Sequence, residues 1–141
     1  MKCLLFGHAN APDCAETTLE ATITDLFKSK DVSEYLVGNN GNFDYMAQKV
    51  LKKLEPLGIS HTVVLSKINE APLYSNWENT IFPESLAKVP PRYAIVKRNE
   101  LMVKEANCAI CYVNHIASNS YKMHLKAIKK GLYVINIASK L

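Results

Sequence analysis

Short apolar runs alternate with longer segments of helical periodicity along most of the chain. The runs predict strands, and the periodic segments predict helices that place apolar side chains on one face. Strands are predicted at residues 2–6, 34–37, 61–65, 108–113 and 132–137, and helices at residues 14–30, 43–56, about 91–106 and about 119–130. Strands that are apolar on both faces and linked by helices are typical of parallel sheets. We therefore expect one domain over residues 1–141, an α/β fold with a doubly wound, mainly parallel, Rossmann-like sheet covered by helices on both faces.

In such sheets ligands bind beyond the carboxyl ends of the strands, at the point where the strand order reverses. Three segments follow predicted strands at that edge: residues 7–10, 38–44 and 114–119. Segment 38–44 is a glycine-containing turn that leads into a helix. Glycine permits close backbone approach, and the N–H groups at a helix start attract an anion. The segment predicts a phosphate-binding loop, although the same residues also suit an ordinary strand-to-helix turn.

Residues 66–90 form a long connection with three prolines and several aromatic side chains. A connection of this length in a compact domain is usually functional or disordered, and this one is too apolar for disorder. One interpretation is a lid over the sheet edge, with Tyr74 or Trp77 able to stack on a base. The alternative is that these aromatic side chains only hold a structured loop together.

The helix after this connection begins at Pro91, a residue that suits the first turn of a helix. Arg92 lies on its predicted apolar face, and Arg98 lies beside that face. Two guanidinium groups at that place suit a phosphate clamp, although each could instead form a surface salt bridge.

Composition is that of a globular protein, with 48% hydrophobic and 21% charged residues among 141. The net charge is +4, and the lysines are spread along polar faces without a dense basic block, so a nucleic-acid partner is unlikely. A modest positive field still favours a small anionic ligand. We find no targeting segment and no apolar stretch of membrane-spanning length, so we expect a cytoplasmic protein without a membrane partner and with reduced cysteines.

Cys108 and Cys111 have the spacing of a metal or redox motif but lie in an apolar run. Residues three apart on a strand face opposite sides of the sheet, so we interpret both as buried thiols. The four histidines have no metal-ligand spacing. We expect no structural metal and no cofactor.

Several segments together resemble the SLOG superfamily, in its YpsA-like branch, which is related to the lysine-decarboxylase-like LOG nucleotide hydrolases. The matching segments are Phe6-Gly7-His8, residues 38–44 (Gly-Asn-Asn-Gly-Asn-Phe-Asp), residues 80–86 (Thr-Ile-Phe-Pro-Glu-Ser-Leu), residues 90–95 (Pro-Pro-Arg-Tyr-Ala-Ile), residues 98–103 (Arg-Asn-Glu-Leu-Met-Val) and residues 131–136 (Gly-Leu-Tyr-Val-Ile-Asn). The resemblance implies a Rossmann-like sheet and a site for nucleotides or molecules derived from them. It also implies a possible homodimer.

The chain departs from that family at two places. Ala9 stands where relatives often have arginine, and residues 114–119 stand where relatives often have a glycine pair. The hydrolases carry a P-G-G-x-G-T-x-x-E motif there, so their acid/base glutamate is missing. Arg98 matches, by motif position, the arginine that those hydrolases use.

Two classes of function fit these residues, and we favour the first. A binding protein would sense or sequester a nucleotide-derived small molecule, such as an ADP-ribose-like ligand, with a site made of Gly7, His8, Gly38, Asn39, Asn40, Gly41, Asp44, Arg92, Arg98, Ser118 and Asn119. An enzyme would cleave the N-glycosidic bond of a nucleoside 5′-monophosphate, which needs a carboxyl group near the sugar. Its catalytic candidates are Asp44 and Glu100, with Glu84 as a further carboxylate. A role in protein interaction, with an inactive pocket, is a third possibility.

Overall fold

The computed structural model describes residues 1–141 and contains one parallel sheet of six strands. The strands are β1 (Lys2–Gly7), β2 (Glu34–Val37), β3 (Ser60–Val64), β4 (Thr80–Ile81), β5 (Cys108–Tyr112) and β6 (Tyr133–Asn136). Their order is β4-β3-β2-β1-β5-β6, and all neighbouring strands are parallel. The predicted α/β class with a Rossmann-like sheet is confirmed.

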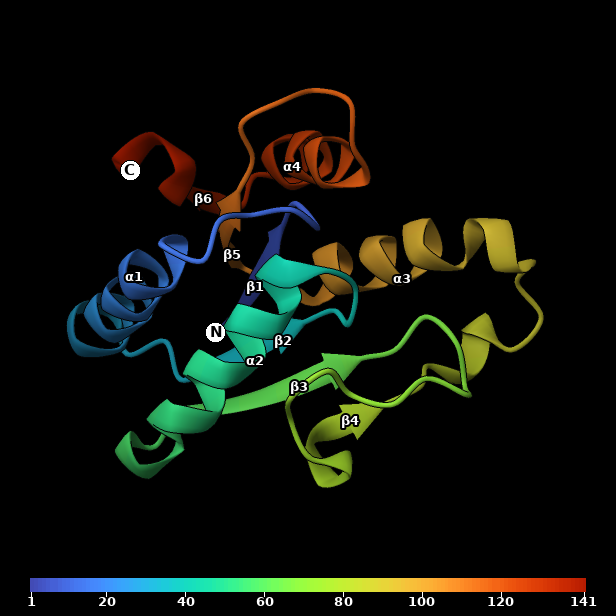
Figure 1. Ribbon diagram of the computed structural model, residues 1–141, viewed down its shortest axis with the longest axis horizontal. Helices are drawn as coiled ribbons and strands as arrows, with labels where there is room; N and C mark the ends of the chain where they lie inside the picture. The colour runs from blue at the N-terminus through green and yellow to red at the C-terminus, as the bar shows by residue number, and fades with distance from the viewer.

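Helices cover both faces of this sheet (Figure 1). The helices are α1 (Ala15–Lys30), α2 (Asn42–Leu54), α3 (Pro91–Glu105) and α4 (Asn119–Lys130), with short 3-10 turns at 55–57, 77–79, 84–86 and 137–140. One core cluster joins the sheet to α1 and α2, and a second joins its other face to α3 and α4. None of the helices is both long enough and apolar enough to cross a bilayer.

The pleat explains why the inner strands β1 and β5 are largely apolar at consecutive positions. Cys3 and Leu5 of β1 belong to the core under α1 and α2, while Leu4 belongs to the core under α3 and α4. On β5, Cys108 faces the first core and Cys111 the second. The prediction that these two thiols lie on opposite faces of the sheet is confirmed.

The strand order places a switch point beside β1. The chain proceeds from β1 outward through β2 and β3, then returns to the other side of β1 as β5. The loops after β1, β2 and β5 therefore diverge around one gap at the carboxyl edge of the sheet, which is where doubly wound folds bind ligands.

Candidate functional site

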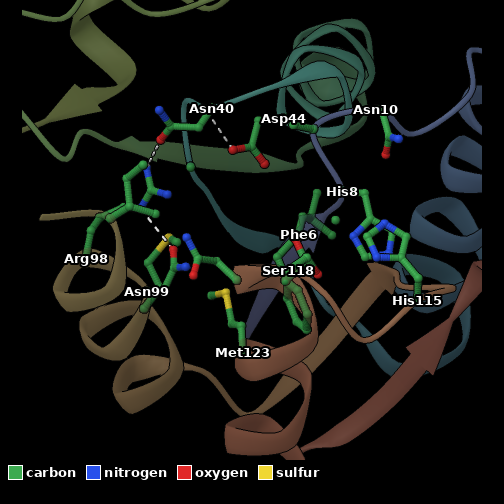
Figure 2. A pocket seen from close by; sticks show the side chains of 18 residues that line it. Phe6, His8, Asn10, Asn40, Asp44, Arg98, Asn99, His115, Ser118 and Met123 are labelled. Carbon is green, nitrogen blue, oxygen red and sulfur yellow. Dashed lines mark hydrogen bonds between the residues drawn. The ribbon is translucent and has the colours of Figure 1, made fainter. Parts of the chain in front are cut away.

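A cavity of about 500 Å³ lies at this switch point. Its walls come from the loops after β1 and β2, from the start of α4 and from one face of α3. Figure 2 shows Arg98 and Asn99 on one side of the cavity and the stacked rings of His8 and His115 on the opposite side. This volume falls in the range of small-molecule sites.

Arg98 projects from α3 to the cavity wall and is only 3% exposed. Its Nη1 donates to Asn40 Oδ1 at 2.7 Å and to the Val64 carbonyl at 3.4 Å, and its Nε donates to Asn99 Oδ1 at 3.1 Å. All three acceptors are neutral oxygens. Burial is the main cause that lowers the pKa of this guanidinium, and Asp44 opposes it. An arginine remains charged in proteins, so the site holds a buried positive charge without a direct carboxylate partner.

Asp44 faces Arg98 across the turn that follows β2. Its Oδ2 accepts the Asn40 N–H at 2.8 Å, which satisfies a donor at the entry of α2. Burial raises the pKa of Asp44 to about 6, against the opposing influence of Arg98 and of the Asn40 N–H. A carboxyl group that titrates near neutral pH can act as an acid or a base, or can accept a hydrogen bond from a sugar hydroxyl.

Gly38 lets these two charged groups come together. A methyl group at position 38 would lie 2.9 Å from Asp44 Oδ2 and 3.0 Å from the guanidinium carbon of Arg98. The glycine is thus required by the close approach of two side chains rather than by its own backbone angle.

His8 follows β1 and is 2% exposed. Its Nε2 accepts the backbone N–H of Asn114 at 2.9 Å, and its ring stacks on His115 with centroids 3.8 Å apart. Burial, and then the charge of His115, lowers the pKa of His8. Because Nε2 is an acceptor, the proton of the neutral ring lies on Nδ1, which is buried without a partner. The neutral ring joins the loop after β1 to the loop after β5.

The start of α4 presents unpaired backbone donors to the cavity. The side chain of Ser118 caps the helix by accepting the Tyr121 N–H, and Asn119 and Ser120 line the cavity. The N–H groups of Asn119 and Ser120 have no acceptor in the protein, and the first turn contains no acidic residue. This helix start therefore has a free positive dipole end, whereas α2 carries its own anion in Asp44.

Two residues of the predicted phosphate turn do not reach the cavity. Asn39 points away from it and donates to the Ala71 carbonyl at 2.8 Å and to Glu70 at 3.1 Å. Gly41 has φ 93° and begins α2 against the backbone of Ala9. Asn39 anchors a loop, and Gly41 shapes the turn.

Of the two arginines in the predicted phosphate clamp, only Arg98 lines the cavity. Arg92 is exposed, lies over the ring of Tyr93 and does not line the cavity, because it precedes Arg98 by six residues on α3 and points to a different side. Of the catalytic candidates, Glu100 forms salt bridges with Lys97 and Lys126 outside the cavity. Glu84 is also outside it and exposed. Asp44 is the only carboxylate in the lining.

The connection at 66–90 does not cover the cavity, since none of its residues lines it. Tyr74 and Trp77 are 49% and 62% exposed. Gln48, fully buried on α2, holds the loop by accepting the N–H groups of Tyr74 and Ser75. The lid interpretation is wrong for this structure. The loop is structured, as the alternative expected, but hydrogen bonds to Gln48 and Asn39 hold it, and of its aromatic side chains Phe82 packs against the core.

Several residues outside the predicted set of ligand-binding residues complete the site. Asn99, next to Arg98 on α3, lines the cavity, and an apolar wall is made of Ile95, Met102 and Met123. The spacing of Ile95, Asn99 and Met102 on one helical face was the available signal. Gln48 gave no signal, since a polar residue on a helix is normally exposed.

Comparison of the chain with models of known protein families finds no matching family, and comparison with curated proteins finds no matching sequence. No group of three or more His, Cys, Asp or Glu side chains is arranged to hold a metal ion. The cavity itself offers a buried guanidinium, a carboxyl group with a pKa of about 6, a free helix start and an apolar wall.

Proposed function

We propose that the cavity at the switch point binds a phosphorylated, nucleotide-derived small molecule, such as an ADP-ribose-like ligand, in order to sense or sequester it. The observation that carries the proposal is the buried Arg98, whose partners are all neutral and which faces a cavity of about 500 Å³. Asp44 lies across the turn but forms no hydrogen bond with this buried charge, and a ligand that brings acceptor oxygens to it supplies a further partner. The resemblance to the SLOG superfamily supports the same class of ligand.

The phosphate in this proposal binds at the start of α4 rather than in the 38–44 turn. Asp44 already occupies the Asn40 N–H in that turn, and a second anion there would be repelled. The N–H groups of Asn119 and Ser120 are free, and the helix dipole favours an anion at that end.

The sugar then lies near Asp44, and the less polar part of the ligand lies against Met102 and Met123. Asp44 has one oxygen bonded to the Asn40 N–H, and its other oxygen forms no hydrogen bond with the protein. That oxygen is suited to accept a hydrogen bond from a ribose hydroxyl.

The alternative is hydrolysis of the N-glycosidic bond of a nucleoside 5′-monophosphate. The pKa of Asp44, raised to about 6, favours it because a general acid or base works best when it titrates near the working pH. Glycosidic cleavage commonly uses two carboxyl groups, and this cavity contains one. We therefore place binding before catalysis.

Isothermal titration calorimetry with AMP and ADP-ribose tests the binding proposal. Arg98→Gln should weaken binding of the preferred ligand by about tenfold or more, because a hydrogen bond to a charged group is lost. Arg92→Gln is the matched control: it removes the same charge from the same helix outside the cavity and should change affinity by less than about twofold. Equal effects of the two variants, with both still folded by circular dichroism, would contradict the proposal.

A chromatographic assay for free base distinguishes the two functions. Release of adenine from AMP that is lost in Asp44→Asn would establish the hydrolase. Binding without base release would establish the sensor or sequestering protein. If neither ligand binds and neither shifts the melting temperature, a protein-interaction role becomes the better explanation.

A further inference from the structure

Arg98 does not use all of its donors within the protein. An arginine side chain has five N–H groups. Its Nη1 and Nε are engaged by Asn40, Val64 and Asn99, and Nη2 has no protein acceptor. Nη2 is also absent from the buried polar atoms that lack partners, so it is open to the cavity that Arg98 lines. Two N–H groups of a buried cation thus remain available to a ligand.

Asn99 is held so that it too offers a donor. Its Oδ1 accepts the Nε–H of Arg98 at 3.1 Å, which fixes the orientation of the amide. Its Nδ2 has no hydrogen-bond partner, and Asn99 lines the cavity. The N–H groups that these two neighbouring side chains leave free are therefore donors aimed at a ligand.

The guanidinium of Arg98 and the start of α4 lie on opposite sides of β1. The guanidinium contacts Gly38, which follows β2, and the carbonyl of Val64 at the end of β3. Ser118 follows β5, and β1 lies between β2 and β5 in the sheet. Asn99 lies between the two sides, since it bonds to Arg98 and lines a crevice together with Asn119 of α4. We expect a phosphate at the Asn119 and Ser120 N–H groups to leave the Nη2 donors of Arg98 for another group of the ligand.

We propose that Arg98 and Asn99 form a second subsite, which binds a part of the ligand that presents only hydrogen-bond acceptors. This inference rests on the proposed function and specifies its ligand class. Two chemical sources supply such a group: the carbonyl edge of an oxo-base, or the oxygens of a second phosphate. An amino group at the same place would direct its N–H atoms at the donors of the protein and leave them unsatisfied.

The opposite polarity of Asp44 orients the ligand in the cavity. Asp44 offers an acceptor oxygen, so a hydroxyl group binds there, while an acceptor group binds at Arg98 and Asn99. The cavity thereby favours ligands that carry a hydroxyl group at one of these places and a hydrogen-bond acceptor at the other.

The test is calorimetry at one pH and salt concentration with three probes: AMP, IMP, and adenosine 3′,5′-bisphosphate. IMP replaces the 6-amino group of AMP by a carbonyl oxygen, and the bisphosphate adds a second phosphate. We expect the probe with the matching group to bind at least about tenfold more tightly than AMP. The probe that gains this affinity identifies which of the two groups occupies the subsite.

Asn99→Asp is the decisive variant. The aspartate keeps an acceptor for the Nε–H of Arg98 but replaces the free Nδ2 donor by an oxygen. The preference over AMP should then fall below about twofold or reverse. Asn10→Asp is the matched control, because Asn10 lines the same cavity beside His8, away from Arg98, and gains the same charge (Figure 2).

The outcomes separate this inference from the proposed function. If the wild-type protein binds all three probes equally, or if Asn10→Asp removes the preference as fully as Asn99→Asp, the second subsite is refuted and nucleotide binding stands. If none of the probes binds and ADP-ribose does not bind either, the proposed function itself is refuted, and this inference with it.

Discussion

Replacing Asp44 by asparagine should make the protein more stable at neutral pH. Asp44 is 5% exposed, and burial raises the pKa of its carboxyl group to about 6 from 3.8. A raised pKa means that the folded state holds the proton more tightly than the unfolded state does. Ionisation of Asp44 therefore opposes folding. An asparagine keeps the acceptor for the Asn40 N–H and carries no charge.

The size of the effect follows from the shift. A rise of about two pKa units corresponds to about 3 kcal/mol. The sign follows from proton linkage: between the two pKa values the folded state binds more protons, so Asp44 makes stability fall as pH rises from about 4 to about 6. Above about pH 6 the full cost is present. Asp44→Asn should remove this cost and gain up to about 3 kcal/mol at pH 8, since the opposing attraction to Arg98 is already contained in the pKa shift.

Urea denaturation of the wild type and the variant from pH 4 to pH 8 measures this effect. Other groups also titrate in this range, so the informative quantity is the difference in unfolding free energy between the two proteins at each pH. That difference should be near zero at pH 4, rise through about pH 6 and then stay level. A variant that is less stable than the wild type at pH 8, or a difference that does not change with pH, would refute this account of Asp44.

Three further predictions concern residues that hold the loops and turns around the cavity. Gln48→Leu should lower the unfolding free energy by about 2–4 kcal/mol and expose residues 70–75 to protease, because the Tyr74 and Ser75 N–H groups lose their acceptor. Gly41→Ala should destabilise by clearly more than Gly131→Ala in thermal unfolding: both glycines have positive φ, but a methyl at 41 meets the Ala9 Cα at 2.4 Å and one at 131 meets nothing within 4 Å. The lowered pKa of His8 should make its contribution to stability complete above about pH 6.5 and lost as pH falls further, and an NMR titration of its ring that gives a pKa above 6.5 would contradict this.

The sequence predicted five of the six strands, most clearly the inner strands that are buried on both faces. It missed β4, a two-residue edge strand within the 66–90 connection. The run at 108–113 is apolar at every position, and the structure places β5 there, between two cores. The switch point followed from the alternation of strands and helices. The location of the cavity, at the loops after β1, β2 and β5, could therefore be predicted from the sequence.

The roles of single polar side chains could not be predicted from the sequence. Asn39 and Asn40 are adjacent in one turn, yet Asn39 bonds to a loop more than thirty residues away and Asn40 supports Arg98. Arg92 and Arg98 lie on the same helix but point to different environments. Such choices depend on tertiary partners, which periodicity does not encode. The occupation of the Asn40 N–H by Asp44 was likewise visible only in three dimensions.

Amide NMR spectra recorded during titration with AMP or ADP-ribose test the central claim most directly. We predict that the largest shifts fall on the backbone amides of Gly38, Asn119 and Ser120 and on the side-chain Nε–H of Arg98, all of which border the cavity. Shifts confined to other surfaces, or none at millimolar nucleotide, would show that this edge of the sheet does not bind a phosphorylated ligand of this kind.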